Sequence, residues 1–164
     1  MIRPIAISLS LLAVTVLASA QGGGDVTSKL TVTRIVKAQD GKETRAAADT
    51  AKPGDVLEYV AEYRNGGKTP ARKLEATLPI PAGTEFLSAT AKPAEVRASV
   101  DGTKFEAVPL KRKVRRADGS TVEEVVPTSE YRFLRWAPRD LAAGRSARYS
   151  ARVRLVTETT PPSS

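Results

Sequence analysis

The side chains with the most evident chemistry are basic, and they gather in two segments. Residues 109–127 read PLKRKVRRADGSTVEEVVP. The cations of this segment are Lys111, Arg112, Lys113, Arg115 and Arg116. A second set alternates with other residues near the end of the chain and consists of Arg148, Arg152 and Arg154. Clustered Lys and Arg side chains attract phosphate and other anionic groups. These eight residues are therefore candidate contacts for a polyanion, either extracellular DNA or an anionic glycan, or for another partner.

The first segment has a structural interpretation as well, because an acidic stretch follows the basic one. A two-residue turn at Asp118-Gly119 places Lys113 opposite Glu124 and Val114 opposite Glu123. Opposite charges on facing strands neutralise one another in part. Charged, solvated edges of this kind are common in β proteins. The pattern predicts a protruding charged β-hairpin, and it leaves open whether the hairpin binds a partner or is only a solvated edge.

Catalytic chemistry is narrowly limited by composition. The chain contains no His and no Cys. Their absence excludes Ser-His and Cys-His nucleophile pairs, imidazole bases and zinc sites built from thiolate or imidazole ligands. A carboxylate-based hydrolase remains an alternative, but no two acids can be placed across a cleft from the sequence. We predict no catalytic residue, no metal site and no cofactor.

The first 20 residues are typical of a secretory signal peptide. Arg3 precedes an apolar run over residues 5–17, and Ala18-Ser19-Ala20 has the small-x-small form that signal peptidase recognises. The run is shorter than the roughly 20 residues that span a bilayer. We expect cleavage after Ala20, a flexible segment over residues 21–28, no membrane span after cleavage, and export to the periplasm, the cell surface or the medium. Residues 157–164 are polar and Pro-rich, and they predict a disordered tail.

Alternation of apolar and polar residues, the period of a strand with one buried face, runs over residues 57–64 and most regularly over residues 146–155. Shorter segments of this kind lie at residues 29–38, 74–78, 84–91, 96–100, 104–108 and 132–136. Tight hairpin turns with φ > 0 are predicted at Asp40-Gly41, Asp101-Gly102, Asp118-Gly119 and Asn65-Gly66-Gly67. For the three Asp-Gly pairs, turns are favoured over calcium sites, because no run of oxygen ligands follows. With no helical period, residues 29–156 predict one all-β domain, an antiparallel β-sandwich.

Several residues in a fixed order resemble a known family. They are Pro53-Gly54-Asp55, Tyr59, Tyr63, Asn65-Gly66-Gly67, Pro81-Ala82-Gly83-Thr84, Trp136, Leu141, Gly144 and Ser146. The set resembles the DUF11 repeat of bacterial surface and secreted proteins over residues 32–155. The resemblance implies an Ig-like sandwich in which these residues are structural, with Trp136 between the sheets, and in which residues 109–127 are an insertion.

Two functions are expected from these observations. The first is a secreted or periplasmic non-enzymatic module that acts in cell-envelope organisation, adhesion or protein assembly, with an envelope protein or glycan as its partner. The alternative is the binding of acidic polymers through the basic residues, which the net charge of +8 favours. Binding driven by phosphate contacts weakens steeply with salt, and this property separates the two.

Overall fold

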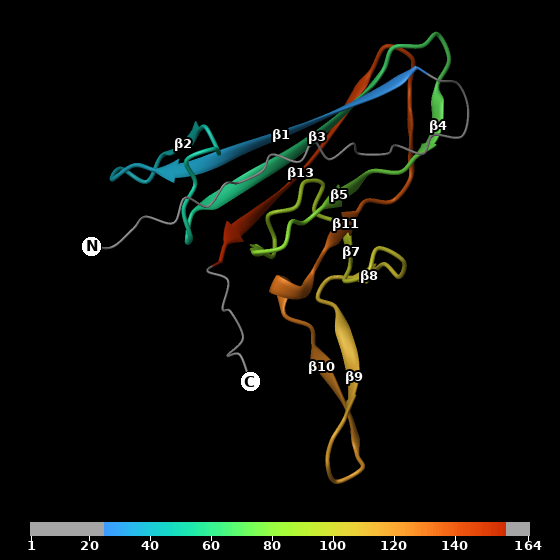
Figure 1. The fold of residues 1–164 in the computed structure, drawn as a ribbon. Helices are drawn as coiled ribbons and strands as arrows, with labels where there is room; N and C mark the ends of the chain where they lie inside the picture. The colour runs from blue at the N-terminus through green and yellow to red at the C-terminus, as the bar shows by residue number, and fades with distance from the viewer. Residues whose placement is uncertain (1–24, 157–164) are drawn as a thin grey trace.

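The structure is a computed structural model that describes residues 25–156. The predicted signal peptide, its cleavage site and the C-terminal tail over residues 157–164 lie outside these residues. The regular elements of the described chain are strands and one short 3-10 turn, with no α-helix (Figure 1). The elements are β1 (Val26–Lys37), β2 (Glu43–Ala46), β3 (Val56–Asn65), β4 (Ala71–Leu74), β5 (Thr77–Pro79), β6 (Thr84–Phe86), β7 (Arg97–Ser99), β8 (Glu106–Ala107), β9 (Lys111–Arg115), β10 (Thr121–Val125), η1 (Thr128–Glu130), β11 (Phe133–Arg135), β12 (Arg139–Leu141) and β13 (Ser146–Leu155).

The long strands β1, β3 and β13 form the centre of a five-stranded antiparallel sheet in the order β2-β1-β3-β13-β6 (Figure 1). Ala61 of β3 lies opposite Leu30 of β1 and Tyr149 of β13. Directly opposite residues share a face, so the alternating apolar residues of the three strands form one buried face. The predicted strand over residues 146–155 is confirmed with the same bounds as β13.

A second sheet, in the order β5-β11-β7-β8, faces this one, and β12 and β4 form a separate antiparallel pair. Leu134 of β11 lies opposite Leu78 of β5 and Ala98 of β7, and all three side chains are buried. The core is thus built mainly from aliphatic residues between two sheets. The predicted all-β, antiparallel sandwich is confirmed.

Trp136 lies just beyond β11 and is buried between the sheets, as predicted. Its ring centroid is 5.1 Å from that of Tyr149 on β13. Its indole N–H donates a hydrogen bond of 2.8 Å to the carbonyl oxygen of Pro93. Tyr149 in turn packs edge-on against Tyr63 of β3, with centroids 5.8 Å apart. One Trp and two Tyr therefore link the second layer to the centre of the first.

Several predicted boundaries differ from the structure. β1 begins at Val26, which pairs with Asn65, so residues 26–28 belong to a strand and not to a flexible segment. The predicted strand over residues 74–78 is divided, because Leu74 ends β4 while Thr77 begins β5, and these two strands pair with different partners. The segments over residues 84–91 and 104–108 contain only the three-residue β6 and the two-residue β8.

The predicted hairpin turn at Asn65-Gly66-Gly67 is wrong. Neither glycine has a positive φ, and the segment carries the chain from β3 of one sheet to β4 of another pair. Asn65 fixes this connection, because its side-chain amide donates to the carbonyl oxygens of Thr69 and Leu141 and accepts from the N–H of Gly67. A Cβ on Gly67 would lie only 2.9 Å from a carboxylate oxygen of Asp25. Close packing, and not backbone conformation, favours glycine here.

Candidate partner-binding hairpin

Strands β9 and β10 form a hairpin that extends away from the two sheets (Figure 1). Its base is fixed to the core by three buried residues, Leu110, Val126 and Tyr131. The N–H of Val126 donates to the carbonyl oxygen of Leu110 at 2.9 Å. The N–H of Leu110 donates to the hydroxyl oxygen of Tyr131 at 2.8 Å, and the Tyr131 ring stacks on Phe86. The stem beyond this base is exposed except at Val114 and Val122, which are half-buried.

The predicted register of the hairpin is wrong by one residue. Lys113 lies opposite Glu123, and Val114 lies opposite Val122. The N–H of Arg116 donates to the carbonyl oxygen of Ser120, so the loop has three residues, 117–119, and not two. Gly119 is the third of them and has a φ of 85°. An Asp-Gly pair suits the two-residue turn and also the three-residue loop with its bulge, and the sequence alone does not choose between them.

Two of the five predicted hairpin cations are paired with carboxylates. The Nζ of Lys111 lies 2.8 Å from Glu123, and a guanidinium nitrogen of Arg112 lies 2.7 Å from Glu130 of η1. The hydrogen bond from Lys111 lowers the pKa of Glu123, and the positive charge of Lys111 is a second, smaller cause of this shift. The same hydrogen bond raises the pKa of Lys111. All four side chains are about half exposed. Local neutralisation, one of the two readings of this segment, is therefore present at the base of the stem.

The other three cations, Lys113, Arg115 and Arg116, are exposed, and no carboxylate within residues 25–156 forms an ion pair with them. Although Glu123 is directly opposite Lys113, its carboxylate contacts Lys111. In the loop, Asp118 accepts hydrogen bonds from the N–H and hydroxyl of Ser120. These bonds lower the pKa of Asp118. The outer half of the hairpin thus presents unpaired positive charge.

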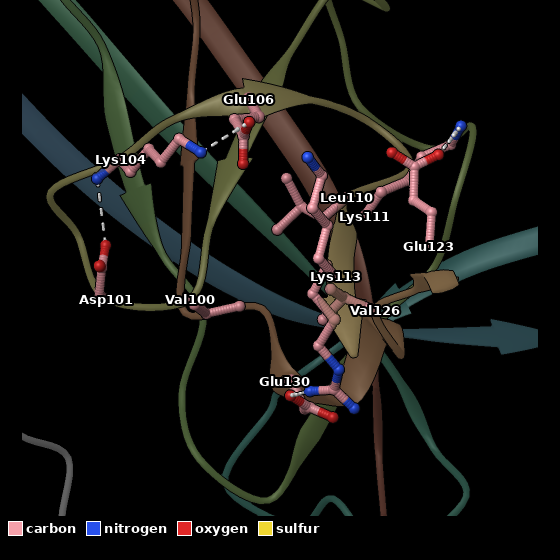
Figure 2. Close-up of a pocket in the computed structure, with 11 residues that line it drawn as sticks. Val100, Asp101, Lys104, Glu106, Leu110, Lys111, Lys113, Glu123, Val126 and Glu130 are labelled. Atoms are coloured by element: carbon pink, nitrogen blue, oxygen red, sulfur yellow. Dashed lines mark hydrogen bonds and ion pairs between the residues drawn. The ribbon is translucent and has the colours of Figure 1, made fainter. Parts of the chain in front are cut away.

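An open groove of about 570 Å³ lies between the base of the hairpin and the loop that joins β7 to β8 (Figure 2). Apolar atoms of Val100, Leu110 and Val126 line it, and Val100 is 46% exposed. Its charged lining is balanced, with four acidic and four basic side chains. Lys104 pairs with Glu106 inside it, as Lys111 does with Glu123. The sequence did not predict this groove, because it depends on how the hairpin meets the β7–β8 loop.

The second predicted set, on β13, is not brought together with the hairpin (Figure 1). Its three arginines share one face of the five-stranded sheet, as expected, but their surroundings differ. Arg148 lies 3.8 Å from Glu62 and Arg152 pairs with two carboxylates. Arg154 is exposed and has no ion-pair partner among the described residues. This set therefore does not form a row of three free cations.

Arg152 belongs to a charged cluster on the outer face of the five-stranded sheet, which sequence reasoning missed. It donates to Glu58 on β3 at 3.3 Å and to Glu43 on β2 at 2.7 Å. Arg45 of β2 donates to Glu58 at 2.9 and 2.6 Å. Since β1 and β3 separate β2 from β13 in the sheet, the β1–β2 hairpin must curl over this face. This curl buries Glu58, which the alternating pattern assigns to solvent. No pattern in the sequence predicts the curl.

Glu58 is held in its charged form within this cluster. Burial by itself raises the pKa of Glu58, but the hydrogen bonds and charges of Arg45 and Arg152 outweigh that effect, so the pKa lies below its usual value. The hydrogen bond from Arg152 likewise lowers the pKa of Glu43. A glycosidase acid requires a raised pKa, which neither carboxylate has. The two acids act here as partners of arginine.

Among residues 25–156, no group of three or more His, Cys, Asp and Glu side chains is arranged to hold a metal ion. Over the same residues, no helix has the length and apolar character that a membrane crossing requires. Comparison with family models, curated proteins and solved structures gave no match. The resemblance to DUF11 repeats therefore stays a prediction.

Proposed function

We propose that this chain is an exported, non-enzymatic β-sandwich module that works in cell-envelope organisation, adhesion or protein assembly, and that its β9–β10 hairpin contacts the partner. One observation carries the proposal. The hairpin extends from the sandwich on a base that is fixed to the core by Leu110, Val126 and Tyr131, while its stem is almost entirely exposed. Such a stem contributes little burial to the sandwich, and its fixed base holds it in a defined direction.

The N-terminal sequence supports export, and the resemblance to DUF11 repeats supports a role in the cell envelope. The partner contact rests on the hairpin alone. Binding residues are often placed on loops and hairpins that a rigid scaffold positions, and this hairpin has that arrangement. Its mixed charges suit a protein surface, because polar and charged residues around an interface give it specificity.

The test is to remove the stem without disturbing its base. Replacing residues 111–125 by Asn-Gly joins Leu110 to Val126 through a two-residue turn, in which the existing bond from the Val126 N–H to the Leu110 carbonyl closes the turn. Wild type and this variant are each cross-linked to native envelope, and the captured partners are compared. We expect the variant to keep its thermal unfolding transition and to lose the partners. A folded variant that captures the same partners contradicts the proposal.

Binding of an acidic polymer is the second candidate, and it is supported by the unpaired cations Lys113, Arg115 and Arg116 on the outer half of the hairpin. Arg154 is a further exposed cation on β13, separate from the hairpin. Phosphate-driven affinity falls linearly with salt on logarithmic axes. Titration of a DNA oligonucleotide and of a sulfated glycan at several salt concentrations checks this candidate. Absence of binding at low salt eliminates it.

A further inference from the structure

Within residues 25–156, strand β9 pairs along one edge, with β10, and no strand pairs with its other edge. The N–H of Arg116 bonds to Ser120 at one end of the hairpin, and the carbonyl of Leu110 accepts from Val126 at the other. In an antiparallel pair, bonded and non-bonded positions alternate along each strand. Counting from Leu110 or from Arg116, the even-numbered residues are the ones bonded to β10. The N–H and C=O groups of Lys111, Lys113 and Arg115 therefore point away from β10. They form an edge on which an additional strand can bind.

The side chains along this edge all carry positive charge. Lys111, Lys113 and Arg115 are separated by two positions each, so they project from the same face of the hairpin. Lys111 is paired with Glu123, whereas the other two have no carboxylate partner in the described chain. A natural edge is often protected from aggregation by such charges. The same charges select for a strand that carries carboxylates at matching positions.

The groove at the base of the hairpin borders part of this free edge. It is lined by Lys111 and Lys113 of β9 on one side and by Lys104 and Glu106 on the other (Figure 2). Its apolar lining includes the exposed side chain of Val100. Because its acidic and basic residues are equal in number, the groove does not attract a polyanion as a whole. It offers room and apolar contact for a peptide that continues beyond β9.

We propose, on the basis of the hairpin function proposed above, that the free edge of β9 binds an extended acidic peptide segment of a partner protein. The segment adds as a further strand and hydrogen-bonds the main chain of Lys111, Lys113 and Arg115. Carboxylates at alternate positions of the segment pair with Lys113 and Arg115. Strand addition of this kind takes its affinity from main-chain bonds and its specificity from alternate side chains. The partner is thus a β-forming segment with acidic residues two positions apart.

The probe for this proposal is a ten-residue peptide that alternates Glu and Thr, measured by fluorescence anisotropy at low salt. When the segment adds antiparallel to β9 with its Glu residues opposite Lys113 and Arg115, the N–H groups of the Glu residues point toward β9 and those of the Thr residues point away. N-methylation of Glu should weaken binding about tenfold or more, because several main-chain bonds are lost. N-methylation of Thr should change affinity less than about twofold. The two peptides have the same composition and charge, so their difference reports the main-chain bonds.

On the protein, Lys113→Pro and Lys113→Gln remove the same charge, and only the first also removes the N–H at the free edge. Proline is tolerated on an edge where no ladder bond is lost, and circular dichroism verifies folding. Lys113→Pro should bind the peptide about threefold to tenfold more weakly than Lys113→Gln. If Lys113→Pro does not fold, the methylated peptides decide the question alone.

A matched charge control uses the other face of the hairpin. Lys113→Gln with Arg115→Gln, and Arg112→Gln with Arg116→Gln, each remove two positive charges, and only the first pair lies on the free edge. The first pair should lose the peptide and the second should retain it. Equal losses in both pairs, equal binding of the two methylated peptides, or no binding of the peptide to wild type each overturn the proposal. Binding of a DNA oligonucleotide in place of the peptide also overturns it, in favour of a polyanion.

Failure of this inference is distinguishable from failure of the proposed function. If the Asn-Gly hairpin replacement loses the envelope partner while Lys113→Pro keeps it, the hairpin is the contact and its free edge is not used. If the replacement keeps the partner, the proposed function itself fails.

Discussion

Glu58 of β3 and Arg152 of β13 lie directly opposite each other, and the Nε of Arg152 is 3.3 Å from a carboxylate oxygen of Glu58. The Glu58 side chain is 8% exposed, and that of Arg152 is 23% exposed. Arg152 also binds Glu43, so it joins the curled β1–β2 hairpin to the centre of the sheet. A cross-strand ion pair thereby becomes a link between three strands.

Arg152→Ala should lower the free energy of unfolding by about 1–3 kcal/mol, because it leaves the buried Oε1 of Glu58 without its donor, while Arg45 still binds Oε2. Arg154→Ala is the matched control on the same strand and face. Arg154 is exposed with no ion-pair partner among the described residues, so its loss should change stability by less than about 0.5 kcal/mol. Urea unfolding at pH 7 measures both. Equal effects would mean that the cluster does not stabilise the sheet.

The contribution of this cluster should depend on pH. The pKa of Glu58 and that of Glu43 are lower in the folded protein than their usual value of 4.5. Below that value the unfolded state binds more protons, so the stabilisation is present above about pH 4.5 and is lost as the pH falls through the folded-state pKa values. The difference in unfolding free energy between wild type and Arg152→Ala should shrink as the pH is lowered from 7 toward 3. A constant difference would show that the carboxylates are not its source.

Trp136→Ala should cost about 3–5 kcal/mol, since it removes a large buried ring from the contact between the sheets. Trp136→Phe keeps an aromatic ring but leaves the Pro93 carbonyl without its donor, and its cost should be smaller. Chemical denaturation with far-ultraviolet circular dichroism gives the two midpoints. A wild-type midpoint for Trp136→Ala would contradict the buried position of the ring.

Tyr131→Phe should cost about 1–3 kcal/mol, because the buried N–H of Leu110 loses its acceptor at the base of the hairpin. Tyr59→Phe is the control, because the Tyr59 hydroxyl forms no hydrogen bond within the described chain and its removal should have little effect.

Converting all five hairpin cations to Gln should leave the unfolding midpoint nearly unchanged. A large loss in that variant would mean that the stem packs as part of the sandwich.

The same five-Gln variant tests the acidic-polymer candidate. If the cations contact phosphate or sulfate groups, affinity for DNA or for a sulfated glycan should fall, and the slope of log affinity against log salt should become shallower. If the slope of log affinity against log salt is unchanged, the hairpin does not contact the polymer, and Arg154 is the next residue to substitute.

Export predicts a mature chain that begins at or near Gln21, because small residues at Ala18 and Ala20 suit signal peptidase. N-terminal sequencing of protein from the periplasm and medium measures the cleavage point. Protein that retains Met1 in a membrane fraction would contradict it.

The sequence was most informative where one strand has a simple alternating pattern. The bounds of β13 were predicted from that pattern, and Trp136 was correctly assigned to the core. Hairpin register was missed because Asp118-Gly119 fits two loop lengths that differ by one residue. Burial of Glu58 was missed because alternation describes a flat strand, and the curl of β2 over the sheet is a property of several strands together. The groove beside β9 depends on the direction of the hairpin, which no local pattern encodes.

The chain enters and leaves the hairpin at one point, where Leu110 bonds to Val126. We therefore expect that a change of length between these two residues leaves the path of the chain elsewhere unaltered. If the hairpin is the partner contact, as proposed above, recognition and folding are encoded by separate parts of the sequence. The sandwich can serve as a constant frame for interchangeable hairpins, and a foreign binding hairpin grafted between Leu110 and Val126 inherits a rigid support.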